Sequence, residues 1–282
     1  MKNLSDKAVL VTLHASAWTG RKDDKKIASE IERQHQAKNA GRYKKNLIDA
    51  TELRTVQNEA SNARLFVKAS TLPWGQGGAR ILPNRQLLSF LEKFRGYKEK
   101  HDEAVQLFLE KYEERVAEAK SLLGGMYSQE DYPSIERMRR KFTMDLDWEA
   151  IAELNDFRLN IDPEAEAEFR QLVEEQYSNK IVEATKDIWV RMQEVVNNVF
   201  TKLSNPDARI YDSLVNDVKE LTVLLPPLNI TADPEIDAAI ASLQTLVVEP
   251  DKLRKSETLR SEKAKEAQGM LKRFSDCLSF AA

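Results

Sequence analysis

The sequence has little of the residue types that enzymes most often use for covalent or metal chemistry. Among 282 residues there are one cysteine, Cys277, and three histidines. A single thiol excludes an intrachain disulfide framework and suits a reducing compartment. No histidine has a second histidine or a cysteine at the spacing of a zinc site, and no GxSxG motif is present. The sequence therefore gives no support to a zinc site or a nucleophilic triad.

Long apolar runs are also missing. The longest, residues 221–230, is broken by two prolines and is too short to cross a bilayer. Residues 8–17 resemble the apolar region of a signal peptide, but Thr12 and His14 interrupt it. We therefore expect a cytoplasmic protein without a membrane segment.

The sequence is rich in helical periodicity over long distances. Apolar residues recur every three or four positions over residues 86–123 and again over 163–204, which predicts two amphipathic helices of about 40 residues each. Long helices of this kind do not persist alone, so we expect each to bury the other's apolar stripe in an antiparallel hairpin. The alternative is that both are core helices of an ordinary bundle. His101 falls on the first stripe and is expected to be a packed core histidine.

Shorter elements complete the predicted fold. Alternating polar and apolar residues over 8–18, 142–148 and 156–161 predict strands of one small sheet. Residues 24–37 have too narrow an apolar edge for more than a weakly anchored helix or a mobile arm. Further helices are expected over residues 47–67, 134–141 and 207–225, and after Pro234 and Pro250.

The predicted fold class is mainly α (α+β), with a long antiparallel helical hairpin, additional C-terminal helices and a small β-sheet. We expect three consecutive segments. Residues 1–83 form a basic strand and helix region, and residues 84–205 form the hairpin with strands inserted at 142–161. Residues 206–282 form C-terminal helices that pack on the hairpin.

Two short motifs have both a functional and a structural interpretation. Gly75, Gly77 and Gly78 suggest a phosphate-binding loop, but they match neither GxxxxGK[ST] nor GxGxxG, so turn chemistry is favoured. Asp145 and Asp147 would share one strand face and could bind a divalent metal with another nearby aspartate. Alternating aspartates are also typical of the exposed face of a strand, and this interpretation is preferred.

Charge is unevenly distributed along the chain. Residues 1–100 contain 20 Lys+Arg and 10 Asp+Glu, whereas residues 101–282 contain 23 and 36, so the formal charges are +10 and −13. A basic first third favours contact with nucleic acid or with an acidic protein partner. The alternative is a solvated surface whose asymmetry is accidental.

Aromatic residues lie beside many of these cations, as they do in proteins that bind single strands. Trp18, Phe66 and Trp74 each stand near lysine or arginine, although Trp18 and Phe66 can equally be core residues. The candidate nucleic-acid-binding residues are Lys25, Lys26, Arg42, Tyr43, Lys44 and Lys45.

Several short motifs are arranged around the first long helix and along most of the chain. They are Leu72-Pro73-Trp74, Ile81-Leu82-Pro83, Leu123-Gly124-Gly125-Met126-Tyr127, Asp131-Tyr132-Pro133, Phe157-Arg158-Leu159, Asp212-Ser213-Leu214, Leu225-Pro226-Pro227-Leu228-Asn229-Ile230-Thr231 and Asp233-Pro234. With these motifs in this order, residues 8–275 resemble an uncharacterised family of tailed-phage and prophage proteins. The resemblance implies a genomic context, since members are often encoded near replication and recombination genes and near a MoxR-type AAA+ ATPase. It implies no activity and no functional residue.

Two hypotheses about function follow. The first is a non-enzymatic, homo-oligomeric phage protein that binds single-stranded DNA in a replication or recombination module, in the cytoplasm of the infected bacterial host. The second is an adaptor or partner protein of an AAA+ ATPase, acting as a protein–protein scaffold. A metal-dependent nuclease that uses Asp145 and Asp147 is a remote third, and no cofactor is expected.

Overall fold

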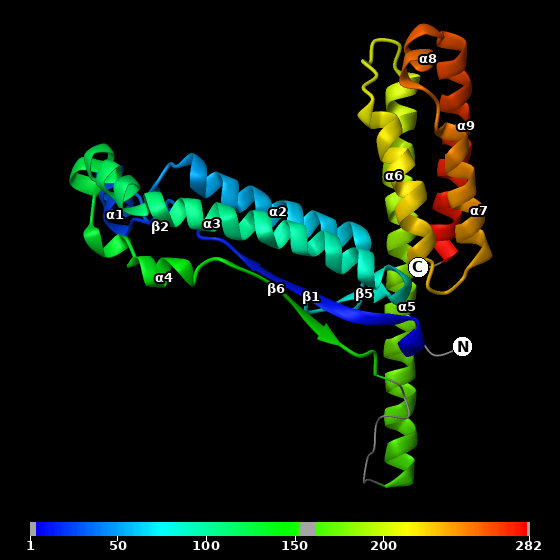
Figure 1. The fold of residues 1–282 in the computed structure, drawn as a ribbon, viewed down its shortest axis with the longest axis horizontal. Coiled ribbons are helices and arrows are strands. Elements are labelled where there is room, and N and C mark those ends of the chain that lie inside the picture. The colour runs from blue at the N-terminus through cyan, green and yellow to red at the C-terminus, as the bar shows by residue number, and fades with distance from the viewer. Residues whose placement is uncertain (1–3, 153–161, 281–282) are drawn as a thin grey trace. The chain divides into compact units, whose positions relative to one another are not determined.

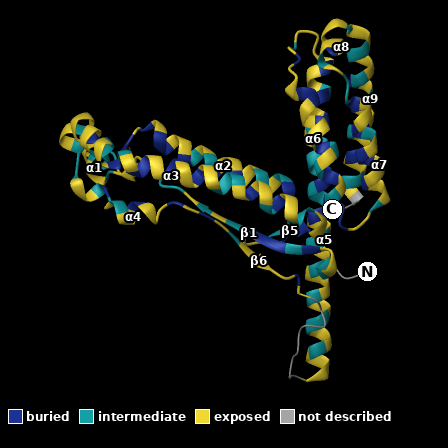
Figure 2. Cartoon of the chain, in the orientation of Figure 1, coloured by how far each residue is buried: buried dark blue, intermediate teal, exposed yellow. Residues whose placement is uncertain are grey.

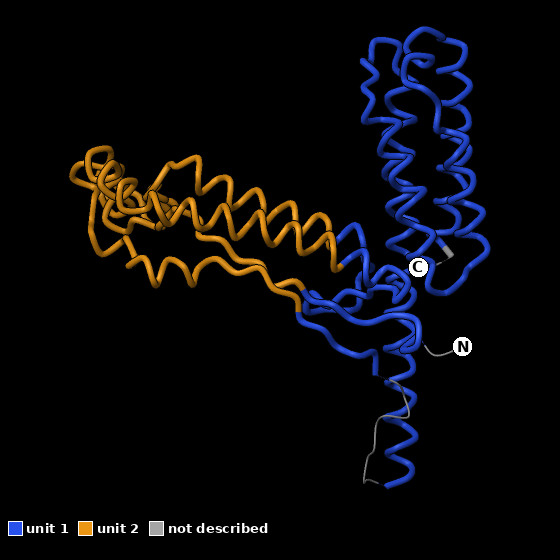
Figure 3. Tube along the Cα trace, viewed as in Figure 1, with its two compact units in different colours: residues 1–12, 68–90, 147–282 blue, residues 13–67, 91–146 orange. Residues whose placement is uncertain are grey.

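The computed structural model describes residues 4–152 and 162–280. These residues divide into two compact units, shown in Figure 3. Unit 1 contains residues 1–12, 68–90 and 147–282, and unit 2 contains residues 13–67 and 91–146. Both units are discontinuous in the sequence, whereas the prediction divided the chain into consecutive segments.

Helices dominate the described residues and strands are short, so the predicted class, mainly α with a small sheet, is confirmed (Figure 1). The helices are α1 (Lys25–Gln34), α2 (Thr51–Ser70), α3 (Leu87–Leu123), α4 (Ile135–Arg139), α5 (Pro163–Ser204), α6 (Ser213–Leu228), α7 (Pro234–Leu243), α8 (Pro250–Lys255) and α9 (Glu257–Phe280). The strands are β1 (Ala8–Ser16), β2 (Arg21–Asp23), β3 (Lys44–Asn46), β4 (Leu72–Pro73), β5 (Arg80–Pro83) and β6 (Thr143–Glu149). The predicted strand over 156–161 lies outside the described residues.

The core of unit 1 forms around α5. Asp162 caps this helix by accepting a hydrogen bond from the backbone N–H of Glu164, and Pro163 occupies the first turn. The buried face of α5 packs along α9, where the rings of Trp189 and Phe274 lie 5.6 Å apart. Since Arg260, near the start of α9, donates to the carbonyl of Pro206 just beyond the end of α5, the two helices are antiparallel. Helices α6 and α7 add Leu225 and other buried residues to the same core.

Helix α6 continues through Pro226 and Pro227 to Leu228, whereas the sequence predicted that these prolines would end it. The carbonyls of the last turn of a helix have no donor within the helix, and those of Pro226 and Pro227 lie in this turn. The guanidinium of Arg85 donates to the carbonyls of both Pro226 and Pro227. An arginine from another part of unit 1 therefore supplies hydrogen bonds that the last turn of the helix cannot supply itself.

The larger sheet has the strand order β4-β5-β1-β6. Strands β1 and β5 are antiparallel, with Ala8 opposite Pro83 and Val11 opposite Arg80. The connection between β4 and β5 contains Gly75, Gly77 and Gly78, all with positive φ, and the N–H of Trp74 donates to the carbonyl of Ala79. The turn interpretation of this glycine cluster is therefore confirmed.

The core of unit 2 forms where α2 and α3 lie side by side (Figure 1). Glu52 near the start of α2 contacts Lys111 in the second half of α3, and Phe66 near the end of α2 stacks on Tyr97 in the first half, with ring centroids 5.0 Å apart. These contacts make the pair antiparallel. His101 is buried on α3, as predicted, and its Nδ1 lies 3.1 Å from a carboxylate oxygen of Asp102.

The structure thus contains long antiparallel helical pairs, but the predicted partners were wrong. Helix α3 buries its apolar stripe with α2 and the residues that precede α2, and α5 buries its stripe with α9. An apolar stripe shows that a helix needs a partner, but it does not identify which amphipathic helix the partner is.

Replacing the buried Leu225 should destabilise unit 1 strongly. Leu225 is 0% exposed and Leu88, in the same unit, is 82% exposed. We expect Leu225→Ala to lower the free energy of unfolding by about 2–5 kcal/mol, because it removes apolar contact and leaves a cavity. Leu88→Ala should change it by less than about 0.5 kcal/mol. Urea unfolding of both variants, followed by circular dichroism, checks this, and equal losses would contradict the assigned core.

Candidate functional site

The basic region between residues 20 and 46 is organised by a small two-stranded ribbon. Strands β2 and β3 pair antiparallel, with Arg21 opposite Asn46, Lys22 opposite Lys45 and Asp23 opposite Lys44. Helix α1 lies between these strands in the sequence and has no buried residue (Figure 2). The ribbon was not predicted, because three-residue strands made of polar residues have no apolar alternation.

One face of the ribbon is fixed by a buried ion cluster. The Lys45 ammonium lies 2.7 Å from the carboxylate of Asp131 and 3.2 Å from that of Asp24, and it donates to the carbonyl of Met126. Lys22, directly opposite Lys45, contacts the other oxygen of Asp131 at 2.5 Å. Two like charges facing each other across a ribbon repel, so the Asp131 carboxylate that pairs with both of them stabilises this register.

The electrostatics of the cluster favour its charged form. Burial alone lowers the pKa of Lys45, but hydrogen bonds to Asp131 and Asp24 outweigh burial and raise the pKa above its usual value. Burial raises the pKa of Asp131, yet the Lys22 and Lys45 contacts bring it below its usual value. The backbone N–H of Ile27, followed by Lys45, lowers the pKa of Asp24. All three groups are therefore ionised at neutral pH.

Around the ribbon is a pocket of about 610 Å³, called the basic pocket below. It is lined by Ala17, Thr19, Arg21, Lys22, Asp23, Lys44, Gln57, Ser61 and Arg64. Four of these nine residues are basic and one is acidic. Within the described part of the chain, no hydrogen bond or ion pair engages the side-chain cations of Arg21 and Lys44. The basic pocket therefore presents positive charge that the protein does not itself neutralise.

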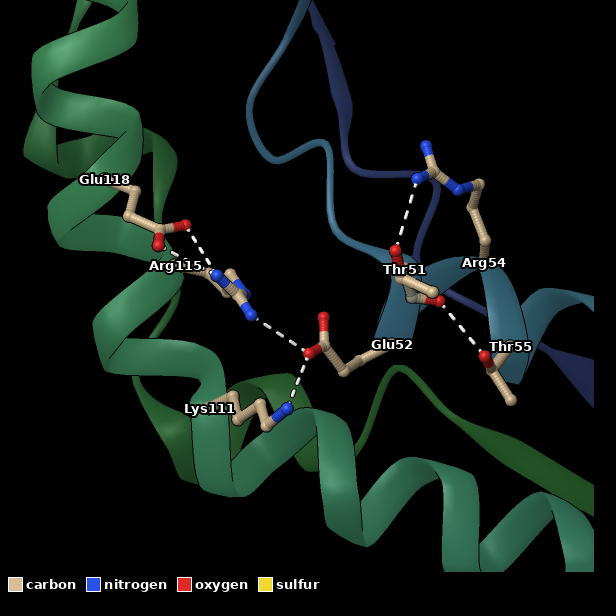
Figure 4. Close-up of polar contacts among 7 residues, drawn as sticks. All are labelled: Thr51, Glu52, Arg54, Thr55, Lys111, Arg115 and Glu118. Carbon is tan, nitrogen blue, oxygen red and sulfur yellow. Dashed lines mark hydrogen bonds and ion pairs between the residues drawn. The ribbon is translucent and has the colours of Figure 1, made fainter.

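Helix α2 forms a second wall of the basic pocket, and ion pairs hold the start of this helix to α3 (Figure 4). The Glu52 carboxylate accepts hydrogen bonds from Lys111 at 2.9 Å and from Arg115 at 3.0 Å. Arg115 also donates to Glu118, and these contacts raise the pKa of Arg115. The hydrogen bonds from Lys111 and Arg115 lower the pKa of Glu52 to about 2.

The structure separates the six candidate residues of the sequence analysis. Lys25 and Lys26 begin α1 and are exposed, and Arg42, Tyr43 and Lys44 are also exposed. Only Lys44 of the six lines the basic pocket.

Lys45 does not suit the role that the sequence analysis gave it. Its side chain is buried, and its ammonium is held by Asp24 and Asp131. A phosphate could reach this ammonium only by breaking two ion pairs, so we assign Lys45 to the support of the ribbon.

The aromatic residues proposed as stacking platforms are mostly packed inside. Trp18 lies against Phe108 and Tyr112, with ring centroids 6.3 and 6.2 Å away. Phe66 stacks on Tyr97, and Trp74 is buried in unit 1. Tyr43 is 36% exposed and remains beside Lys44 in the sequence.

Sequence reasoning missed the part of the basic pocket that α2 contributes. Gln57, Ser61 and Arg64 are spaced at i, i+4 and i+7, which places them on one helical face. This polar stripe was the available signal. The sequence alone could not show that this face of α2 and Arg21 line the same pocket.

Two other expectations concern groups outside the pocket. Asp145 pairs with Lys98 at 2.7 Å. In residues 4–152 and 162–280, no three His, Cys, Asp or Glu side chains are grouped so that they could hold a metal ion. None of the helices in these same ranges is both long enough and apolar enough to cross a membrane.

Comparison with protein-family models, with curated proteins and with solved structures gave no match. Any function assigned to the protein therefore depends on the residues of this chain alone.

Neighbouring lysines provide a matched test of the ion cluster. Lys45→Ala should lower the free energy of unfolding by about 3 kcal/mol, because it leaves two carboxylates without their buried cation. Lys44→Ala removes an exposed lysine and should change it by less than about 0.5 kcal/mol. Urea unfolding of the two variants measures the difference. Similar losses would show that Lys45 is not the residue that fixes the ribbon.

The Glu52 contacts predict a dependence of stability on pH. The pKa of Glu52 is about 2 in the folded protein, against an ordinary value of 4.5. A lowered carboxyl pKa stabilises the fold above the ordinary value, and this stabilisation is lost as the pH falls through the folded pKa. Glu52→Gln should therefore lower the melting temperature by several degrees at pH 7, whereas near pH 2 the variant and the unsubstituted protein should melt at nearly the same temperature.

Thermal melting at pH 7, 4.5 and 2.5 measures this effect. Glu113→Gln, an exposed glutamate on α3, is the control and should follow the unsubstituted protein at every pH. A constant difference between Glu52→Gln and the unsubstituted protein at all three pH values would contradict the assigned pKa.

Proposed function

We propose that the protein binds nucleic acid through the basic pocket of unit 2. The observation that carries the proposal is the convergence of Arg21, Lys44 and Arg64 around one pocket, with Lys22 beside them. Phosphates are the anions that such a group of separated cations suits, since each cation can neutralise a different phosphate along a strand.

The cations are held before any ligand arrives. The Lys45 cluster fixes the ribbon that carries Arg21 and Lys44, and the Glu52 contacts fix the start of the helix that carries Arg64. Little ordering of the backbone is then needed on binding, and less free energy is lost to conformational entropy.

The proposal concerns binding alone. The basic pocket has no histidine and no cysteine, and it has a single carboxylate, that of Asp23. A general acid–base pair or an activated thiol would need groups that the lining does not contain.

An acidic surface of a protein partner, such as an AAA+ ATPase, could use the same cations. This second hypothesis of the sequence analysis predicts a different outcome of the same experiment, because a protein partner requires no affinity for DNA. The two hypotheses can therefore be separated without knowledge of the partner.

Fluorescence anisotropy with labelled single- and double-stranded DNA over a salt series tests the proposal. We expect Arg21→Ala/Lys44→Ala to weaken binding at low salt roughly tenfold or more. For a single strand, log K decreases as log salt rises, and the magnitude of this slope should become smaller by about 1.4, because each of the two lost phosphate contacts contributes about 0.7. Lys100→Ala/Lys120→Ala, which removes two exposed lysines of unit 2 outside the pocket, is the charge-matched control.

Equal weakening in the two double variants would mean that total charge, and not the basic pocket, determines binding. Absence of binding to any DNA or RNA at low salt would reject the proposal and leave the pocket for an acidic protein partner. Circular dichroism of each variant verifies that the helices remain folded.

A further inference from the structure

The two walls of the basic pocket differ in chemistry. The ribbon wall supplies the side-chain cations of Arg21 and Lys44. The α2 wall supplies Gln57, Ser61 and Arg64, one turn or so apart on a single face of the helix. The uncharged side chains of this second wall add hydrogen-bonding groups to the charge that neutralises phosphates.

The α2 wall offers hydrogen-bond acceptors. The side-chain amide N–H of Gln57 donates to the carbonyl of Trp18 at 2.9 Å, which leaves its Oε1 to accept. The Ser61 hydroxyl donates to the backbone carbonyl of Gln57 at 2.8 Å, which leaves lone pairs on its oxygen. These oxygens repel a phosphate, but they suit the N–H groups on the edge of a nucleobase.

The same wall offers a flat surface for stacking. One nitrogen of the Arg64 guanidinium donates to the carbonyl of Ala15 at 2.6 Å, which ties this planar group to the residues that precede the ribbon. Guanidinium planes stack on nucleobases in proteins that bind unpaired nucleotides. Arg64 therefore offers a planar surface as well as a positive charge.

Resting on the proposed function, we infer that the basic pocket takes one unpaired nucleotide. The base stacks on Arg64 with its N–H edge toward Gln57 and Ser61, while the flanking phosphates lie at Arg21 and Lys44. A volume of about 610 Å³ is within the range of pockets that enclose a single small ligand.

This arrangement selects a single strand over a duplex. In a duplex the base edges pair with each other and the faces are stacked, so a base can enter the pocket only after unpairing, which costs free energy. An unpaired strand avoids that cost. A free mononucleotide has the same base and phosphate, so it is a second source of the same ligand chemistry.

The inference is tested with four probes: labelled oligothymidylate, an abasic strand of equal length, a duplex of equal length, and thymidine monophosphate as a competitor. Oligothymidylate should bind at least about fivefold more tightly than the abasic strand, since stacking of one base gives roughly that factor or more. Arg64→Lys keeps the charge and removes the plane, so it should abolish this preference and leave binding of the abasic strand unchanged. Gln57→Ala should also reduce this preference, because it removes the amide oxygen that accepts a hydrogen bond from the base.

Arg54→Lys is the matched control, because Arg54 is on the same helix, is exposed and lies outside the pocket. It should leave the preference intact. Thermal melting of each variant establishes that the change in binding does not come from loss of the fold.

The outcomes separate the inference from the proposed function. Equal binding of the abasic strand, the duplex and oligothymidylate would overturn the inference and leave the proposed function standing. Binding of thymidine monophosphate titrated alone by calorimetry, without binding of any strand, would support the inferred nucleotide pocket but reject the proposed function. Absence of binding to every probe would reject both.

Discussion

A buried ammonium group stays charged only where carboxylates surround it, and the basic region of this protein is built on that constraint. Lys45 is 6% exposed, and its charge is balanced by Asp24 and Asp131. Asp24 caps α1, and Asp131 comes from the short 3-10 helix Gln129–Asp131. One lysine therefore connects three segments that are distant in the sequence.

The alternation of a strand turns this constraint into the surface that we propose for binding. Because neighbouring residues of β3 point to opposite faces, burial of Lys45 directs Lys44 away from the cluster. The same geometry on β2 separates Lys22, which faces Asp131, from Arg21. Because Lys45 and Lys22 are paired with Asp131, Lys44 and Arg21 are the cations of the ribbon that a ligand can reach.

Much of the helical fold could be predicted, because long periodic stripes are a strong signal. The predicted ranges 86–123 and 163–204 agree with α3 and α5 at nearly every residue. The partners could not be predicted, since α2, α5 and α9 all carry apolar stripes that satisfy the same requirement. The end of α6 was missed because the residue that binds the carbonyls of its proline turn, Arg85, is distant in the sequence.

The candidate site was less accessible to sequence reasoning than the fold. Counting charge located the basic region but could not tell Lys44, which is exposed, from its buried neighbour. Interleaved aromatic residues drew attention to Trp18 and Phe66, whose rings pack against other rings of unit 2. Burial depends on tertiary contacts between distant segments, and composition does not report them.

In the complex with nucleic acid that we propose, salt acts differently on the two walls of the basic pocket. Attraction between exposed cations and phosphates is screened over about 8 Å at physiological ionic strength, so the contribution of Arg21 and Lys44 decreases as salt rises. Stacking on Arg64 and hydrogen bonds to Gln57 act at contact distance and are screened much less. Total affinity and preference for a base are therefore separable quantities: salt lowers the first and leaves the ratio between a base-carrying and an abasic strand nearly constant. A pocket that used charge alone would have no such ratio to preserve.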